Sequence, residues 1–158
     1  MYLRSLLRLA LLFAVLPAGC RQRLPYEGKS VDQLVSMLKG SNPATRSQGA
    51  YGLSLLGPKA KPAVAALVAA LQDSQPLTRQ NAALALGSMG SDAAEAVPAL
   101  IAALDDSEWT VRRQAALALG HIGAAAREAI SPLMRLTRDR DTLVRKAAAE
   151  ALHQIGPG

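Results

Sequence analysis

One arginine recurs every 33 residues along the chain, and this spacing restricts the fold more than any other feature of the sequence. Alanine follows each arginine after four residues, leucine after seven and glycine after eleven. The four sets are Arg46, Ala50, Leu53 and Gly57; Arg79, Ala83, Leu86 and Gly90; Arg112, Ala116, Leu119 and Gly123; and Arg145, Ala149, Leu152 and Gly156. Sequences with a fixed repeat of this length fold as stacked copies of one small unit. A four-unit array is therefore predicted.

Each unit has the apolar spacing of two helices. Upstream of each arginine, apolar residues recur at i, i+3 and i+4, which is the pattern of one helix face. These rows are Val31, Leu34 and Val35; Val64, Leu67 and Val68; Val97, Leu100 and Ile101; and Ile130, Leu133 and Met134. Small and aliphatic residues downstream of the arginine have the same period. The sequence predicts an all-α solenoid of four helical hairpins, at about 30–57, 60–90, 93–123 and 126–156.

Capping and turn residues predict where the helices begin and end. Pro43 and Pro76 occupy equivalent places, and proline fits the first residue of a helix, so the second helices should begin near 43, 76, 109 and 142. Asn42 and Asp141 are then N-cap candidates, and the run Ser-Val-Asp-Gln at 30–33 is a capping box for the first helix. The repeated glycines suit helix C-termini that need a left-handed residue.

The runs at 96–106 and 111–123 resemble HEAT repeats, in particular the short bacterial HEAT-like repeats related to phycobiliprotein lyase subunits. The resemblance covers about residues 30 to 156. Ankyrin repeats have a similar length, but this chain has no Thr-Pro-Leu-His run. Tetratricopeptide repeats need aromatic positions that a chain with one Trp and one Phe does not supply.

This resemblance implies a ladder of ion pairs along the solenoid, because in the family an aspartate at the inter-helix turn lies six residues before the arginine. The implied pairs are Asp73 with Arg79, Asp106 with Arg112 and Asp139 with Arg145. Gly40 stands at the first aspartate position, so we expect Arg46 to lack a partner and the first unit to be looser. Each aspartate is spaced for an arginine, which favours ion pairing over cation binding.

The first 29 residues have a different character. Residues 1–19 combine Arg4 and Arg8 with the apolar run 9–16, and this run is far shorter than the roughly 20 residues that span a bilayer. This is the pattern of a secretory signal peptide. The following Cys20, the chain's one cysteine, ends a segment that looks like a bacterial lipobox, although Pro17 displaces the usual leucine by one place. We expect residues 20–29 to form a lipidated cysteine and tether.

Lipidation at Cys20 predicts an exported protein, anchored by lipid to a membrane of the cell envelope. The alternatives are an ordinary cleaved signal, which gives a periplasmic or secreted soluble protein, and an uncleaved anchor or misread start. Removal of Arg4 and Arg8 lowers the formal net charge from +6 to +4. The remaining charge is small and partly in the tether, so a nucleic-acid partner is not expected despite a pI near 10.0.

No constellation of residues indicates an enzyme. His121 and His153 are not in equivalent register, and neither is followed by the glutamate that HEAT-repeat iron hydroxylases use. No serine or cysteine nucleophile has a plausible base, and no glycine-rich phosphate loop follows a strand. We predict no catalytic residue, no metal site and no cofactor, with both histidines solvated.

Helical geometry predicts where a partner would bind. Residues one, two and nine places after each arginine should point away from the packed face, and residues five places after it should border that face. Family architecture places second helices on the concave side, so an apolar stripe would line it. The partner-binding candidates are Tyr51, Gln80, Leu84, Trp109, Arg113, Gln114, Leu117 and His121. The alternative for Leu84 and Leu117 is packing between neighbouring repeats, and for Trp109 it is covering the inter-helix turn.

The leading functional hypothesis is a non-enzymatic protein-binding or scaffold module, monomeric and tethered to the bacterial envelope, with a protein partner on the concave face. The alternative is an accessory protein for handling a chromophore or cofactor protein, as the lyase-related resemblance implies. A hydrolase or metal enzyme is the third class, and the sequence offers almost no support for it.

Overall fold

The computed structural model describes residues 24–156, and within them every regular element is a helix. The elements in chain order are α1 (Val31–Leu38), α2 (Pro43–Leu56), η1 (Gly57–Ala63), α3 (Val64–Ala70), α4 (Pro76–Ser88), η2 (Gly90–Ala96), α5 (Val97–Ala103), α6 (Trp109–Ile122), η3 (Gly123–Ala129), α7 (Ile130–Leu136) and α8 (Thr142–Ile155), where η marks a 3-10 helix. The second helices begin at residues 43, 76, 109 and 142, so the predicted starts are confirmed. The predicted signal peptide and Cys20 lie outside the described residues.

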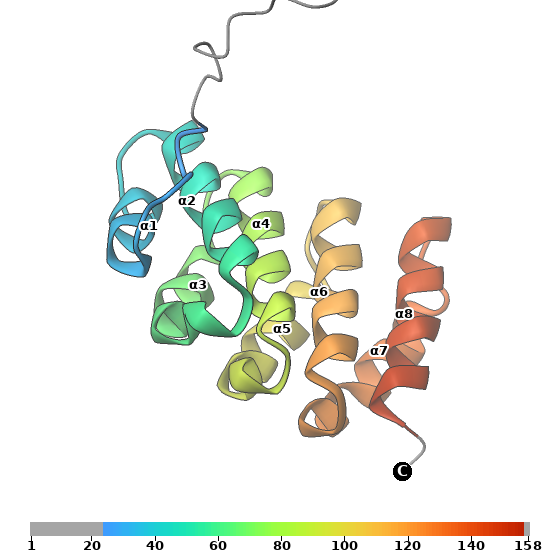
Figure 1. Cartoon of the computed structure of the whole chain (residues 1–158). Coiled ribbons are helices and arrows are strands. Elements are labelled where there is room, and N and C mark those ends of the chain that lie inside the picture. The colour runs from blue at the N-terminus through green and yellow to red at the C-terminus, as the bar shows by residue number, and fades with distance from the viewer. Residues whose placement is uncertain (1–23, 157–158) are drawn as a thin grey trace, which may run out of the picture.

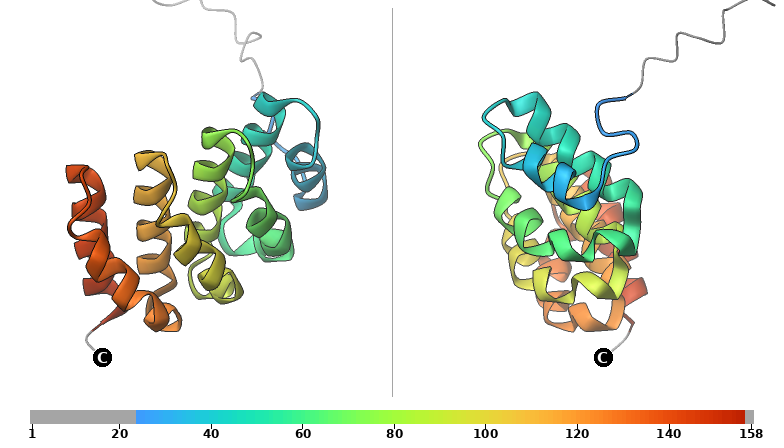
Figure 2. Two further views of the ribbon diagram at one scale, coloured as in Figure 1. Left: turned by 180° about the vertical axis from the view of Figure 1, so that it is seen from behind. Right: turned by 60° about the vertical axis from the view of Figure 1, so that its left-hand side comes forward.

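The helices form two layers, which confirms the predicted solenoid (Figure 1). The even-numbered helices α2, α4, α6 and α8 lie side by side in chain order, and their mutual contacts are the most extensive in the molecule. Each odd-numbered helix packs against the even helix of its own unit, and the η segments connect the layers (Figure 2). The even-numbered helices therefore form the continuous layer of the array.

The helix starts are capped as the sequence predicts. Ser30 Oγ accepts the Gln33 N–H at 3.3 Å while Gln33 Oε1 accepts the Ser30 N–H at 3.0 Å, which completes the capping box of α1. Asn42 Oδ1 accepts two backbone N–H groups at the start of α2, and Asp141 Oδ1 does the same for α8. These caps satisfy N–H groups that have no partner within the helix.

A glycine with positive φ ends each second helix or lies just beyond it. The φ angles are 54° at Gly57, 58° at Gly90 and 72° at Gly123, a region that favours residues without a Cβ. A 3-10 turn follows each of these glycines and leads into the short first helix of the next unit. The apolar spacing alone did not separate this 3-10 turn from the α-helix that follows it.

Small residues let the even helices approach closely. A Cβ added to Gly120 on α6 would lie 2.9 Å from Ala151 Cα on α8, and one added to Gly87 on α4 would lie 2.9 Å from Ala118 Cα on α6. Large residues fill the space between the layers instead, and the leucine row of the first helices is at most 1% exposed. That row consists of Leu34, Leu67, Leu100 and Leu133. The core thus combines tight contact within the even layer with leucine packing between layers.

Candidate functional site

Each repeated arginine except the last pairs with an aspartate of the following unit. Arg112 Nε donates to Asp139 Oδ2 at 2.8 Å and Arg112 Nη2 donates to Asp139 Oδ1 at 3.0 Å. The equivalent pairs, each also joined by two hydrogen bonds, are Arg46 with Asp73 and Arg79 with Asp106. The partners are 27 residues apart, so every pair joins two neighbouring units.

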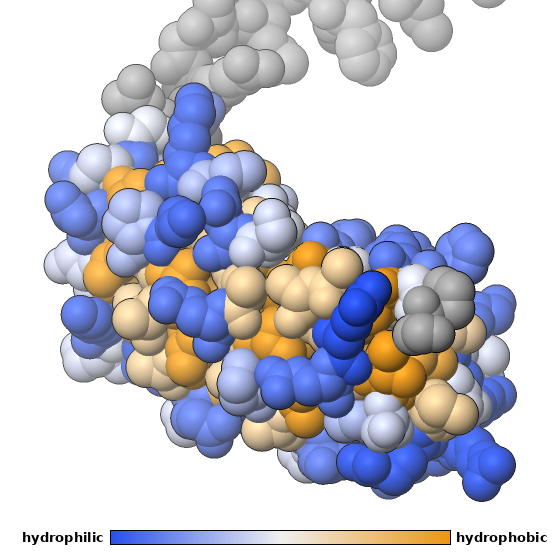
Figure 3. Space-filling model, turned by 90° about the horizontal axis from the view of Figure 1, so that it is seen from below, coloured by the Kyte–Doolittle hydropathy of each residue, from blue (hydrophilic) through white to orange (hydrophobic). Residues whose placement is uncertain are grey.

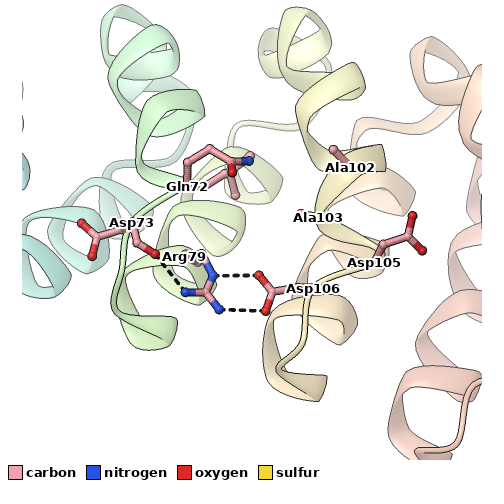
Figure 4. Close-up of a pocket in the computed structure, with 8 residues that line it drawn as sticks. Gln72, Asp73, Arg79, Ala102, Ala103, Asp105 and Asp106 are labelled. Atoms are coloured by element: carbon pink, nitrogen blue, oxygen red, sulfur yellow. Dashed lines mark hydrogen bonds and ion pairs between the residues drawn. The ribbon is translucent and has the colours of Figure 1, made fainter.

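The expected pairing within each unit is therefore wrong. Arg79 Nη1 donates to the backbone carbonyl oxygen of Asp73, six residues earlier, at 2.9 Å, while its other nitrogens reach forward to Asp106 (Figure 4). The carboxylate of Asp73 is held in its own turn, since Oδ1 accepts the Gln75 N–H at 2.8 Å, and from there it faces Arg46 of the preceding unit. In the same way, Arg112 and Arg145 donate to the backbone carbonyl oxygens of Asp106 and Asp139, six residues earlier, and not to their carboxylates.

The expected defect at the start of the ladder is also wrong. Arg46 binds Asp73 and also donates through Nη1 to the carbonyl oxygens of Gly40 and Ser41. A glycine suffices at position 40, because the arginine six residues later uses only the backbone there. The first unit is joined to the second as firmly as the later units are joined to each other.

The end of the ladder is at Arg145 instead. Its Nη1 donates to the Asp139 carbonyl oxygen at 2.9 Å and to the Arg140 carbonyl oxygen at 3.2 Å, as in the other units. Nη2 donates to Thr142 Oγ1 at 2.8 Å. Within residues 24–156, no carboxylate forms a salt bridge with this arginine.

The ladder shifts the titration of its own members. Hydrogen bonds from Arg46 lower the pKa of Asp73, and those from Arg112 lower the pKa of Asp139. Burial raises the pKa of Asp106, but hydrogen bonds from Arg79 and from the Glu108 N–H outweigh it, so this pKa is also lowered. The pKa of each partner arginine is raised, chiefly by the hydrogen bond to the aspartate. All three pairs are charged at neutral pH.

The described residues hold no group of three or more His, Cys, Asp or Glu side chains that could bind a metal ion. The ladder aspartates that also line the polar cleft of about 280 Å³ in Figure 4 are engaged with Arg46 and Arg79. His121 and His153 are exposed, as predicted.

Some residues of the predicted binding rows are less exposed than helical-wheel geometry predicts. The row two places after the arginine lies largely between adjacent even helices: Asn81 and Gln114 are 9% exposed and Ala147 is 2% exposed. Asn81 Nδ2 donates to the Ser47 carbonyl oxygen at 3.0 Å, which links α4 to α2. Gln114 is therefore wrong as a surface candidate, because the neighbouring helix covers the angle that an isolated helix would expose.

The other candidates divide into exposed and half-buried residues. Tyr51, Trp109, Arg113 and His121 are exposed, and Gln80 is half-buried. Leu84 and Leu117 are also half-buried, and Leu117 packs against the core. A continuous exposed leucine stripe across α4 and α6 is therefore not present, and for Leu117 the packing alternative is correct.

A cluster of apolar residues lies at the first two units instead, while the exposed Trp109, Met134 and Leu143 lie elsewhere on the array. Tyr26, from the segment before α1, packs edge-on against Tyr51 of α2 with ring centroids 5.2 Å apart. Leu55 at the end of α2 is 60% exposed, and Leu77 at the start of α4 is 55% exposed. We call these four residues the aromatic patch. They place two aromatic rings between two exposed leucines.

A cavity lies on each side of the tyrosine pair. One is a groove of about 320 Å³ between α2 and α4, and the other is a pocket of about 440 Å³ between α2 and the segment 24–29. The groove is lined by Tyr26, Ala44, Ser47, Gln48, Tyr51, Leu77 and Asn81. The pocket is lined by Leu24, Tyr26, Glu27, Gly28, Lys29, Leu34, Tyr51, Gly52, Leu55 and Leu56. Both tyrosines line both cavities.

Sequence reasoning missed Tyr26 and Leu77. Residues 24–29 were assigned to the tether, but the structure docks Tyr26 onto α2 at Gly52, where a Cβ would lie 2.8 Å from Tyr26 Cβ. The available signal was Gly52 itself, because the equivalent position in the other units is alanine. Leu77 lies two residues before Arg79. It shares a helix face with Leu84, seven residues later.

The surface seen from the side where the second helices end is mixed in character (Figure 3). Hydrophobic residues appear there in short stretches separated by hydrophilic side chains. Met134 of α7, at 60% exposed, is an isolated apolar side chain on the odd layer rather than part of the aromatic patch. Single exposed apolar residues are ordinary on protein surfaces, whereas a cluster beside cavities indicates a binding site.

A family model described as HEAT repeats matches residues 31–107 and 97–157. No curated protein sequence matches the chain. Among solved structures, an engineered protein is 27% identical with a TM-score of 0.69, over 82% of this chain and 64% of that one. A designed armadillo repeat protein in complex with the peptide (KR)4 is 21% identical with a TM-score of 0.70, over 80% of this chain and 64% of that one.

The complex of CpcE and CpcF of phycocyanin lyase from Nostoc is also similar. The identity is 22% and the TM-score 0.67, and the match covers 77% of this chain and 79% of that one. This chain therefore spans less than two thirds of the two designed proteins but most of the lyase chain. At 21% and 22% identity the armadillo and lyase likenesses show a shared fold.

Proposed function

The chain belongs to the HEAT-repeat family, a fold suited to protein binding and scaffolding, and from this premise we propose that it is a non-enzymatic module that holds a protein partner at the aromatic patch and is tethered to the bacterial cell envelope. The observation that carries the proposal is the edge-to-face pair of Tyr26 and Tyr51 between two cavities. Aromatic side chains beside pockets are the residues that most often dominate the free energy of protein binding.

The chemistry of the patch favours an extended peptide or a helix with apolar anchors. Leu55 and Leu77 extend the apolar surface on either side of the tyrosine pair, so a segment crossing α2 and α4 would bury leucine and aromatic area together. The groove between the helices also contains the carboxamide of Gln48, which offers hydrogen bonds to a peptide backbone. A partner with two apolar residues and a polar connection fits these features.

Partner capture from envelope fractions tests the patch. The Leu55→Asp and Leu77→Asp variants should lose a partner that the unchanged chain retains, because each places a charge where apolar area would be buried. Met134→Asp is the matched control, since Met134 and Leu55 are both 60% exposed but on different layers. All variants should keep the same helical circular dichroism spectrum. Equal capture by Leu77→Asp and Met134→Asp would refute the patch as the binding surface.

The proposed tether would hold the first unit close to the membrane. Only three residues lie between Cys20 and Leu24, and the four Cα-to-Cα steps from one to the other span at most about 14 Å. The docking of Tyr26 onto α2 makes the segment 24–29 part of the array, so few residues lie between the array and the proposed anchor. Arg21 and Arg23 in this short connection would favour anionic head groups.

The repeat helices give little support to an alternative membrane attachment. The helical stretch Pro43–Ala70 contains an 18-residue window with a mean hydropathy of 1.2, apolar enough to cross a bilayer by length and composition alone. It is divided at Gly57 into α2, η1 and α3, and these elements contribute to the core of the array. Incorporation of a radioactive fatty acid into the full chain, compared with Cys20→Ser, tests the lipid anchor. Equal labelling of the two chains would refute the lipid anchor at Cys20.

A second candidate function is the handling of a chromophore or cofactor protein. It is favoured by the structural likeness to the CpcE–CpcF complex of phycocyanin lyase, which extends over most of both chains. Titration of the chain with a phycobilin, followed by visible absorption, distinguishes this function from general protein binding. A saturable spectral change that Tyr51→Ala abolishes would favour it, and an unchanged spectrum would exclude direct chromophore binding.

A further inference from the structure

The last repeated arginine is held in the geometry that binds a carboxylate in the other three units. Arg46, Arg79 and Arg112 each donate through Nη1 to the backbone of their own turn, and Arg145 does the same, with its Nη1 2.9 Å from the Asp139 carbonyl oxygen. In the first three, this contact leaves Nε and Nη2 aimed at the aspartate of the next unit. The guanidinium of Arg145 is therefore already oriented to bind a carboxylate.

The donors that bind the carboxylate elsewhere are differently engaged at Arg145. Nη2 donates to Thr142 Oγ1 at 2.8 Å, and Nε has no acceptor among residues 24–156. The surface around it is uncovered as well. Ala149, four residues later, is exposed, whereas its equivalents in the other units are 0% exposed: Ala50, Ala83 and Ala116.

We infer that Arg145 is a second interaction site, at the C-terminal end of the array, which binds the aspartate or glutamate side chain of a protein partner. The three pairs within the chain show the expected contact, a carboxylate accepting hydrogen bonds from both Nε and Nη2. Arg140 and Lys146, both exposed, flank Arg145 and together outweigh the half-buried Asp141 at the start of α8, so the site favours an acidic partner although Glu150 lies further along the helix. This site is independent of the aromatic patch.

A second copy of the chain, stacked end to end, does not fit this site. The unit that stacks on Arg145 would have to present the aspartate of its inter-helix turn, and the first unit has Gly40 at that position. His153 opposes the same packing, because it stands where Gly87 and Gly120 allow the next even helix to approach. A Cβ at either glycine would lie 2.9 Å from a Cα of that helix. Continued stacking at the spacing of the array is therefore blocked.

Arg145 remains accessible despite this block. It lies eight residues before His153 on α8, which is about 12 Å along the helix axis. A partner can thus contact the beginning of α8 through its carboxylate while diverging from the helix before it reaches the histidine. A loop or turn fits this constraint better than a parallel helix does.

Side-chain NMR with a defined peptide tests the site. The protein is the full chain, and the probe is a blocked peptide of residues 100–111, the turn whose Asp106 binds Arg79. We expect a saturable shift of the Arg145 Nε–Hε resonance. We expect at least fivefold weaker binding for the Asp106→Asn peptide and no binding to Arg145→Gln. Arg113→Gln, an exposed arginine on α6, is the matched control and should bind normally.

Three outcomes would overturn the inference: equal affinity for the Asp106→Asn peptide, retained binding by Arg145→Gln, or a shift at Arg113 in place of Arg145. Sedimentation velocity of the free chain tests whether a second copy of the chain occupies the site. Association between copies that Arg145→Gln abolishes would identify a second copy rather than a partner. Leu77→Asp should leave peptide binding unchanged, so failure at Arg145 and failure at the aromatic patch are distinguishable.

Discussion

Arg112 and Asp139 form a bidentate ion pair between the third and fourth units, with both side chains less than a tenth exposed. Neither residue has its charged partner within its own unit. In the two inner units the aspartate and the arginine therefore face in opposite directions along the array, so the ladder connects units while each arginine also holds the backbone of its own turn.

Removal of one ladder arginine should destabilise the whole array. Arg112→Ala leaves the Asp139 carboxylate with little solvent and no arginine, and we expect the free energy of unfolding to fall by about 2–4 kcal/mol. Arg113→Ala, one residue along on an exposed side chain, should change it by less than about 0.5 kcal/mol. Urea unfolding of both variants makes the comparison. Equal losses would show that the ladder contributes nothing specific.

A double-mutant cycle should show which arginine is coupled to Asp106. We expect the Asp106→Asn and Arg79→Gln substitutions to be coupled by about 0.5–3 kcal/mol, because the two side chains share two hydrogen bonds. Coupling to Arg112→Gln should be much smaller, since Arg112 binds only the carbonyl oxygen of Asp106. Stronger coupling to Arg112 would restore the pairing within units that the structure contradicts.

The array should lose stability in acid through its ladder. The pKa values of Asp73, Asp106 and Asp139 are lowered in the folded state, so unfolding takes up protons and the pairs stabilise the fold fully above the ordinary aspartate pKa of 3.8. That stabilisation disappears as the pH falls below this value and through the lowered pKa. Urea unfolding from pH 6 to pH 2 measures the change. A variant with all three aspartates changed to asparagine should be less stable at pH 6 and lose less on acidification.

Gly52→Ala should release Tyr26 from the array. The added methyl group would lie 2.8 Å from Tyr26 Cβ and 2.5 Å from Leu34 Cδ2, and alanine stands at the equivalent positions where no tyrosine docks. We expect loss of the nuclear Overhauser contacts between the Tyr26 and Tyr51 rings, with the contacts among α4, α6 and α8 retained. Tyr26→Ala is the companion variant and should weaken partner capture to the same extent. Intact ring contacts in Gly52→Ala would contradict the proposed role of the glycine.

The repeat period predicted the fold because it reports local geometry. Helix starts, caps and positive-φ glycines depend on residues within a few positions of each other, and Pro43, Asn42 and Gly57 have the structures expected of them. The ladder partners could not be derived in the same way. A fixed period of 33 makes a contact six residues back and a contact 27 residues forward equally regular, so spacing alone cannot choose between them.

The candidate site was harder to predict for a related reason. Burial of Gln114 depends on how close α6 lies to α4, the preceding even helix, and the helical angle of Gln114 contains no information about that distance. Tyr26 lies outside the repeats and has no equivalent residue to reveal its role. The departures from the period at Gly52 and Gly40 were visible in the sequence, and only the structure showed what each one accommodates.

The forward pairing of arginine and aspartate also bears on how such an array changes length in evolution. Each of the two inner units brings an acceptor for the unit before it and a donor for the unit after it. Duplication or loss of an inner segment therefore joins an existing donor to an existing acceptor, and no compensating substitution is needed at the new junction. Terminal units are exempt from this exchange, because Gly40, Gly52 and His153 adapt them to their ends.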